Sequence, residues 1–211
     1  MAPLLKESGL RSAVFGIETL NHEAGKAIGK GLHPEHTEEL LSWLRGEQGW
    51  SGQVAMFSGF IIGLPHETKE TCEAWMSRVA DPTFPLDSFM FTPLSMNIHP
   101  ESTKVYRSQF ELEYAKYGYV FDDPEDPYNW RNGDFTFNQA KELARDAYRA
   151  SVRAGRQKAG AFTLLMLKNF GFGDDLLMSK PGLSYTNRHD LLARRIEYVN
   201  SYYERLMNVA L

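Results

Sequence analysis

Two short segments of the sequence carry the residues that could bind a ligand. In Phe15–Asn21 an apolar run ends at Glu18 and Thr19, and in Gly59–Thr68 an apolar run ends at the turn Gly63-Leu64-Pro65. A helix-like stretch follows each segment. In a parallel βα arrangement, side chains and free backbone amides at the carboxyl ends of the strands face the ligand. The pattern therefore predicts a binding site built from two strand ends.

Three apolar runs, at 12–17, 54–62 and 86–92, alternate with helical patterns. A helix opened by Pro34 follows the first run, and a helix that begins near Thr68 and ends at Asp81 follows the second. Before the first strand, residues 4–9 are typical of the last turns of a helix closed by Gly9. The third apolar run shows no alternation, which suits a strand covered on both faces. Together these patterns predict a parallel α/β sheet.

The rest of the chain has a different character. Residues 96–135 are rich in aromatic and acidic side chains, and we expect a long ordered excursion. It is either a structural wrap over the bottom of the sheet or a substrate lid or interface. Helices are expected from Thr136, where Gln139 completes a capping box, to about Arg156, and at 159–170 and 189–207. The predicted divisions are 1–95, 96–135 and a mainly helical extension at 136–211.

The composition argues against several classes of function. The chain has 211 residues and a net charge of −4, so a broad basic surface for nucleic acid is not expected. Cys72 is the single cysteine, which excludes an internal disulfide, and no apolar run approaches the roughly 18 to 20 residues of a membrane helix. The strand ends lack a nucleophile elbow or paired carboxylates, which argues against an ordinary hydrolase. We expect a cytoplasmic protein.

Five short motifs follow one another along residues 4–95: Ser8-Gly9-Leu10, Gly16-Ile17-Glu18-Thr19, Ala27-Ile28-Gly29-Lys30-Gly31, Gly63-Leu64-Pro65-His66-Glu67-Thr68 and Phe91-Thr92-Pro93-Leu94. In this order and spacing the chain resembles the radical S-adenosylmethionine (SAM) family, closest to its B12-binding-type and anaerobic coproporphyrinogen-oxidase-like branches. The resemblance spans what the family shows from its fourth to its sixth strand. It implies half of a (β/α)6 partial TIM barrel, with three parallel βα units.

The resemblance also implies which residues contact SAM. Glu18, followed by Thr19, stands where the family places a polar side chain near the ribose or the amino acid moiety. Lys30 stands where related enzymes carry a basic residue that pairs with the SAM carboxylate. A lysine offers that carboxylate a point charge rather than the fork of arginine. The adenine would be lined by residues of the second and third strands: Ile61, Gly63, Leu64, Pro65, Thr92, Pro93 and Leu94.

The family's cluster motif, Cys-x3-Cys-x2-Cys, has no counterpart in this chain. In the family these thiolates hold a [4Fe-4S] cluster whose electron cleaves SAM to a 5′-deoxyadenosyl radical. The resemblance therefore implies a SAM-binding half that is inactive alone and needs a cluster-bearing N-terminal half. Exposed edges at the first and third strands predict such a partner or self-association. The alternative is a non-catalytic remnant that binds a nucleotide-like ligand or a protein; the substrate and any use of cobalamin are not indicated.

The remaining candidate residues favour structural roles. Cys72 lies on the apolar stripe of a predicted helix, where a free cysteine packs as a small hydrophobe. The histidines lack the spacing of metal ligands, so a zinc site is not expected at His22, His33, His36, His66 or His99. His66 is the exception to follow, because it lies at a helix N-terminus and could touch a ligand or cap the helix.

Overall fold

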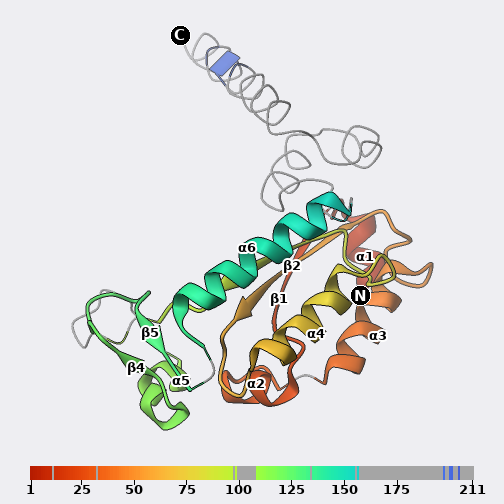
Figure 1. The fold of residues 1–211 in the computed structure, drawn as a ribbon. Coiled ribbons are helices and arrows are strands. Elements are labelled where there is room, and N and C mark those ends of the chain that lie inside the picture. Colours follow the sequence, from red (N-terminus) through yellow and green to blue (C-terminus); the bar gives the residue numbers. More distant parts are fainter. Residues whose placement is uncertain are drawn as a thin grey trace.

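The structure is a computed structural model that describes residues 1–154 except 11, 32, 97, 99–107 and 134, together with residue 156 and residues 197, 200, 201 and 204. Within these residues the chain combines a three-stranded sheet with packed helices and a smaller two-stranded sheet (Figure 1). The helices expected at 159–170 and 189–207 fall outside the described residues, apart from those four positions, which are helical. None of the described helices is both long and apolar enough to cross a membrane.

The larger sheet is parallel and follows the chain order. β1 (Ser12–Glu18) pairs with β2 (Ala55–Ile62), and β2 pairs with β3 (Ser88–Pro93). The order β1-β2-β3 confirms the predicted alternation of parallel strands and helices. All three carboxyl ends therefore lie at one edge of the sheet, where the predicted binding residues occur.

Local signals at the helix starts explain where the first helices form. α1 (Ala2–Glu7) ends just before Gly9, as predicted. Gly9 has a φ of +102°, a conformation that glycine adopts without strain. α2 (His22–Ala27) was not expected; the side-chain oxygen of Asn21 caps it by accepting from two backbone amides. α3 (Pro34–Arg45) has proline in its first turn, where a missing N–H costs no hydrogen bond.

The later helices begin at capping boxes. In α4 (Lys69–Ala80) the Thr68 hydroxyl accepts from the Thr71 amide, and the Thr71 hydroxyl accepts from the Thr68 amide. Before α6 (Phe137–Arg153), Thr136 and Gln139 exchange the same pair of bonds, as predicted. α6 packs against β3 (Figure 1). Residues of α4 and α6 together line a groove.

The helices cover one face of the sheet with an aromatic core. Phe60 of β2 and Phe91 of β3 pack against Trp75 of α4, with ring centroids 5.7 and 5.8 Å from that of Trp75. Alternate residues of a strand face opposite sides. The other face of the sheet therefore carries Val14 and Gly16 of β1 and Gly59 and Ile61 of β2, all at least partly exposed.

Charged side chains tie the amino ends of the strands together. Asp87, buried just before β3, accepts hydrogen bonds from the Arg45 guanidinium and from the Met56 amide of β2. Arg156 donates to main-chain carbonyl groups at the end of α4 and in the following turn, including that of Ala80. These contacts lie at the end of the sheet opposite to the predicted binding residues.

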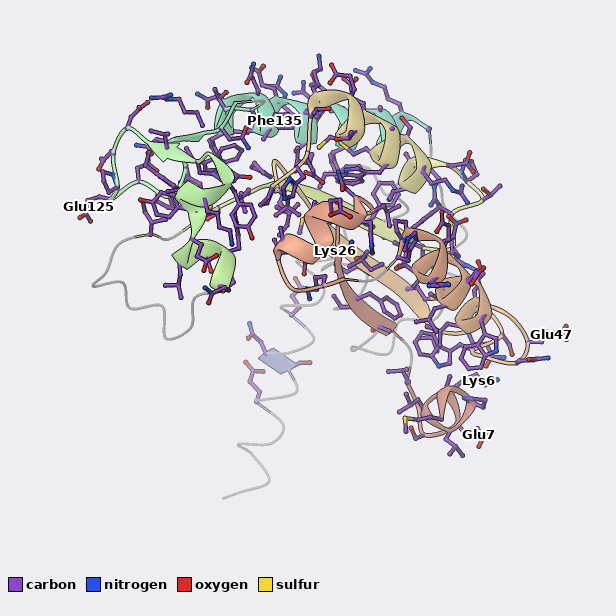
Figure 2. All side chains as sticks on the ribbon, turned by 90° about the horizontal axis from the view of Figure 1, so that it is seen from below. Lys6, Glu7, Lys26, Glu47, Glu125 and Phe135 are labelled. Carbon is purple, nitrogen blue, oxygen red and sulfur yellow. The ribbon has the colours of Figure 1, made fainter. Side chains whose placement is uncertain are left out.

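The excursion after β3 packs on the turns that follow β2 and β3, where the Tyr119 hydroxyl donates to the Gly63 carbonyl and the Trp130 indole N–H donates to the Leu94 carbonyl. Of the two predicted alternatives, the wrap over the bottom of the sheet is therefore wrong. It contains α5 (Gln109–Leu112), a 3₁₀ helix at Tyr114–Tyr117, and the antiparallel strands β4 (Val120–Phe121) and β5 (Trp130–Arg131). Figure 2 shows Glu125, between β4 and β5, at one extremity of the molecule. The excursion lies here because its aromatic side chains, such as Tyr119 and Trp130, bury large areas against the turn after β2.

Candidate functional site

The predicted ligand-binding residues Glu18 and Lys30 meet at the carboxyl end of β1. The Glu18 Oε1 and Lys30 Nζ atoms are 3.8 Å apart, and the side chains are 26% and 44% exposed. Gly16 lies beneath them: a Cβ atom at this position would lie 3.1 Å from Glu18 Oε1 and 3.2 Å from Lys30 Nζ. Glycine at position 16 therefore leaves room for the ion pair on the open face of the sheet.

The backbone of Glu18 is held in an uncommon conformation. Its φ is +69°, in the left-handed region that non-glycine residues seldom adopt, at a cost of roughly 1 to 2 kcal/mol. The β1–β2 register shifts between Phe15 and Glu18, as at a β-bulge. Bulges aim side chains away from the regular pleat and occur often beside binding sites. Here the bulge places the Glu18 carboxylate over Gly16 and next to Lys30.

Thr19, the next predicted binding residue, is buried and engaged with the protein itself. Its hydroxyl donates a 2.8 Å hydrogen bond to Glu67 Oε1 and accepts from the Asn21 amide. Thr19 therefore joins the end of β1 to the turn that follows β2. Its side chain supports the site from below and does not face a ligand.

Glu67 is the residue that organises this region, a role that no sequence pattern indicated. Its carboxylate is buried and accepts five hydrogen bonds. The donors are the Thr19 hydroxyl, the Gly63 and Leu64 amides, the Cys72 thiol and the Trp75 indole N–H. One side chain thus fixes the end of β1, the turn after β2 and the start of α4 relative to one another.

Burial shifts the acid–base properties of Glu67 and its neighbour. Loss of solvent raises the pKa of the Glu67 carboxyl, and the hydrogen bonds that it accepts oppose that change. The pKa of the Cys72 thiol is raised by burial and by the adjacent Glu67 carboxylate. Cys72 therefore remains a protonated core residue that donates to Glu67, as its predicted structural role requires.

The turn after β2 is covered by the excursion. Gly63 has a φ of +89°, and a Cβ atom there would lie 2.5 Å from Cη2 of the Trp130 ring. The Tyr119 hydroxyl donates a 2.5 Å hydrogen bond to the Gly63 carbonyl. Three further predicted adenine contacts are buried in the same region, namely Leu64, Pro65 and Leu94. The close approach that glycine permits at position 63 is made by Trp130.

The other predicted adenine contacts remain partly exposed. Ile61 of β2 and Thr92 of β3 are directly paired in register on the open face, and Pro93 follows them. The Thr92 hydroxyl donates to the Phe60 carbonyl, which orients its methyl group. Among the described residues, no atom lies within 4 Å of a Cβ position at Gly59. The open face therefore offers a mostly apolar floor beside the Glu18–Lys30 pair.

The structure also brings together three histidines that are dispersed along the sequence. The ring centroid of His33 lies 4.3 Å from that of His22 and 5.9 Å from that of His36. His33 Nδ1 is 2.5 Å from Glu35 Oε2. No group of three or more metal-ligating side chains among the described residues has the arrangement to hold a metal ion. His66, with a φ of +65°, contacts the Tyr117 ring edge to face, and His99 is outside the described residues.

Comparison with known proteins identifies no relative of this chain. No protein-family model, no curated protein and no solved structure matches the chain. A functional assignment therefore depends on the residues themselves. The candidate site consists of an accessible ion pair, an open sheet face and a rigid support built around Glu67.

Proposed function

We propose that this chain is the SAM-binding half of a radical SAM enzyme and forms three βα units of a (β/α)6 partial barrel. The proposal is supported by the parallel order β1-β2-β3 and by the position of Glu18, Lys30, Ile61 and Thr92 at the carboxyl ends of the strands. These ends are where α/β folds bind their ligands. The five motifs along residues 4–95 supply the link to this family.

The observation that carries the proposal is the Glu18–Lys30 pair. The methionyl part of SAM is a zwitterion, with an ammonium group and a carboxylate on the same carbon atom. Lys30 would pair with that carboxylate, and Glu18 would accept hydrogen bonds from the ammonium group or the ribose. At 3.8 Å the two side chains are too far apart for a direct hydrogen bond, so both retain bonding capacity for a ligand.

The apolar floor suits the rest of the ligand. A nucleobase needs a flat surface on which it can stack and an adjacent polar group for its edge. Ile61 and Thr92 offer a partly exposed surface, and Gly59 allows a ligand to approach the backbone. We place the adenine over Ile61 and Thr92, and not at Gly63, because Trp130 covers that turn.

The cluster that would reduce SAM does not fit this chain. Cys72 is the single cysteine of the sequence, and its thiol is buried and donates to Glu67. A [4Fe-4S] cluster requires several thiolates. SAM bound here would supply radical chemistry when another polypeptide brings the cluster. We therefore assign the binding and orientation of SAM to this chain, and the reduction of SAM to an N-terminal half.

Isothermal titration of the chain with SAM and with 5′-methylthioadenosine tests this assignment. The second ligand keeps the adenine and the ribose but lacks the amino acid zwitterion. We expect the wild type to bind SAM more tightly than methylthioadenosine. We expect Lys30→Ala to weaken SAM about tenfold, the scale of one charge-assisted hydrogen bond, and to leave methylthioadenosine unchanged.

Lys26→Ala provides the matched control. Lys26 is also a lysine near β1, paired with Glu23 on the surface of α2 (Figure 2), and it should not affect either ligand. Equal loss of both ligands in Lys30→Ala would show that Lys30 acts through folding. Absence of SAM binding to the wild type, or SAM binding that is insensitive to Lys30, would overturn the proposal.

A second candidate, the non-catalytic remnant that binds a nucleotide-like ligand, is favoured by one observation. The Trp130 ring and the Tyr119 hydroxyl cover the Gly63 turn, where the family would place adenine contacts. A remnant could keep an adenosine site without selecting the amino acid part. It predicts equal affinity for SAM and methylthioadenosine in the same titration.

A further inference from the structure

Three histidines join the starts of α2 and α3, the two helices that flank Lys30. His22 is the first residue of α2, His33 stands at the N-cap position of α3, and His36 lies in the first turn of α3. The ring centroid of His33 is 4.3 Å from that of His22 and 5.9 Å from that of His36. Imidazole is the side chain whose charge ordinarily changes between about pH 5 and 8. The contact between the two helix starts is therefore made by groups that acid can charge.

The His22–His33 contact closes the short connection that carries Lys30. At one end of this connection, the Lys30 amide donates a 2.8 Å hydrogen bond to the Gly25 carbonyl of α2. At the other end, the ring of His33 lies against that of His22. The glycines on either side of Lys30 have φ values of +77° and +54°, and glycine allows the chain to turn at both points. The direction in which Lys30 projects therefore depends on the His22–His33 contact.

We propose that the three histidines hold Lys30 in place for SAM near neutral pH and release it when a second imidazole is protonated. This regulation rests on the proposed function, in which Lys30 pairs with the SAM carboxylate. A first positive charge is accommodated, because Nδ1 of His33 lies 2.5 Å from the Glu35 carboxylate. A second positive charge at His22 would be in contact with the first, and like charges at this distance repel each other. The partial positive charge at the start of α3 adds to the repulsion.

The other charged groups near these histidines are already balanced. On α2 the Glu23 carboxylate accepts a 2.9 Å hydrogen bond from Lys26 Nζ. In the connection, Lys30 forms the ion pair with Glu18. His66, in the turn after β2, also interacts electrostatically with Glu23, and its protonation would add one more positive charge. A second imidazolium therefore leaves an excess of positive charge between the starts of α2 and α3, and this excess favours their separation.

Isothermal titration at about pH 7 and at about pH 5.5, on either side of the usual pKa of histidine, tests the release of Lys30. We expect the wild type to bind SAM about tenfold more weakly at the lower pH, the effect of losing one charge-assisted contact. The affinity for 5′-methylthioadenosine should stay unchanged, because that ligand lacks the carboxylate. Equal loss of both ligands would show that acid unfolds the site as a whole, and would overturn the proposal.

A histidine variant tests whether the imidazoles cause the effect. His22→Gln keeps a planar polar side chain but cannot be protonated, so it should bind SAM equally well at both pH values. His66→Gln is the matched control. His66 is also a histidine beside the carboxyl ends of the strands, but its ring contacts Tyr117, and the variant should keep the pH dependence of the wild type. An unchanged pH dependence in His22→Gln would overturn the proposal.

Proton NMR of the chain without ligand separates this regulation from SAM binding. Nuclear Overhauser effects between the ring protons of His22 and His33 report the contact directly. We expect these effects at about pH 7 and their loss at about pH 5.5. A contact that persists at the lower pH would overturn the regulation and leave the SAM assignment standing. A wild type that binds no SAM at either pH would overturn the SAM assignment and, with it, the regulation of that site.

Discussion

Thr19 and Glu67 are 48 positions apart in the sequence, yet the Thr19 hydroxyl donates a 2.8 Å hydrogen bond to the buried Glu67 carboxylate. This bond ties the strand that carries Glu18 to the turn that follows β2. The same carboxylate receives the Gly63 and Leu64 amides. The position of the Glu18–Lys30 pair relative to Ile61 therefore depends on a residue that does not face the ligand.

The first prediction concerns this support. Glu67→Gln keeps the size of the side chain but replaces one acceptor oxygen with an N–H₂ group that faces donors. We expect a loss of about 1 to 3 kcal/mol in the free energy of unfolding, the usual cost of leaving a buried polar group without a partner. Urea unfolding followed by tryptophan fluorescence measures it. A variant as stable as the wild type would show that the five hydrogen bonds contribute nothing net.

The second prediction concerns pH. Because burial raises the pKa of Glu67 in the folded state, the folded chain binds more protons than the unfolded chain at pH values between the two. The stability that the wild type gains from the Glu67 carboxyl is complete below the pKa that this group has in the unfolded chain. It is lost as the pH rises through the pKa of Glu67 in the folded chain. The advantage of the wild type over Glu67→Gln should therefore shrink with rising pH. An advantage that grows from acid to neutral pH would mean that the hydrogen bonds to the Glu67 carboxylate lower its pKa more than burial raises it.

The third prediction concerns Gly63. In Gly63→Ala the new methyl group meets the Trp130 ring, and the positive φ adds strain. We expect a loss of about 3 kcal/mol or more, since overpacking and the strained backbone act together. Gly118→Ala is the control, because Gly118 has a φ of +79° but no atom within 4 Å of its Cβ position, and it should lose about 1 kcal/mol. Equal losses in thermal unfolding would contradict the close contact with Trp130.

The alternation of strands and helices through β3 could be predicted from the sequence because local patterns encode it. The apolar runs, Pro34 and the Thr136–Gln139 box all lie within or directly before the elements that they define. The six-residue α2 was missed, since it is too short for a helical period and contains Gly25; the Asn21 cap was the one available signal.

The covering of the site could not be predicted in the same way. Tyr119 reaches a carbonyl 56 positions away, and nothing local to Tyr119 or to Trp130 indicates which turn their rings cover. The central role of Glu67 arises from donors on separate elements, such as Thr19 and Trp75. The gathering of His22, His33 and His36 follows from the loop that brings α3 beside α2. Such contacts come from tertiary packing and not from sequence spacing.

The central claim is that SAM lies on the open sheet face beside the Glu18–Lys30 pair. A methyl-labelled sample titrated with SAM and observed by two-dimensional NMR tests it directly, because an adenine ring shifts the methyl signals that it covers. We predict saturable shifts for the methyl groups of Ile61 and Thr92, and none for Leu112, which lies on α5. Shifts confined to other parts of the chain, or signals at Ile61 and Thr92 that do not move, would contradict the account.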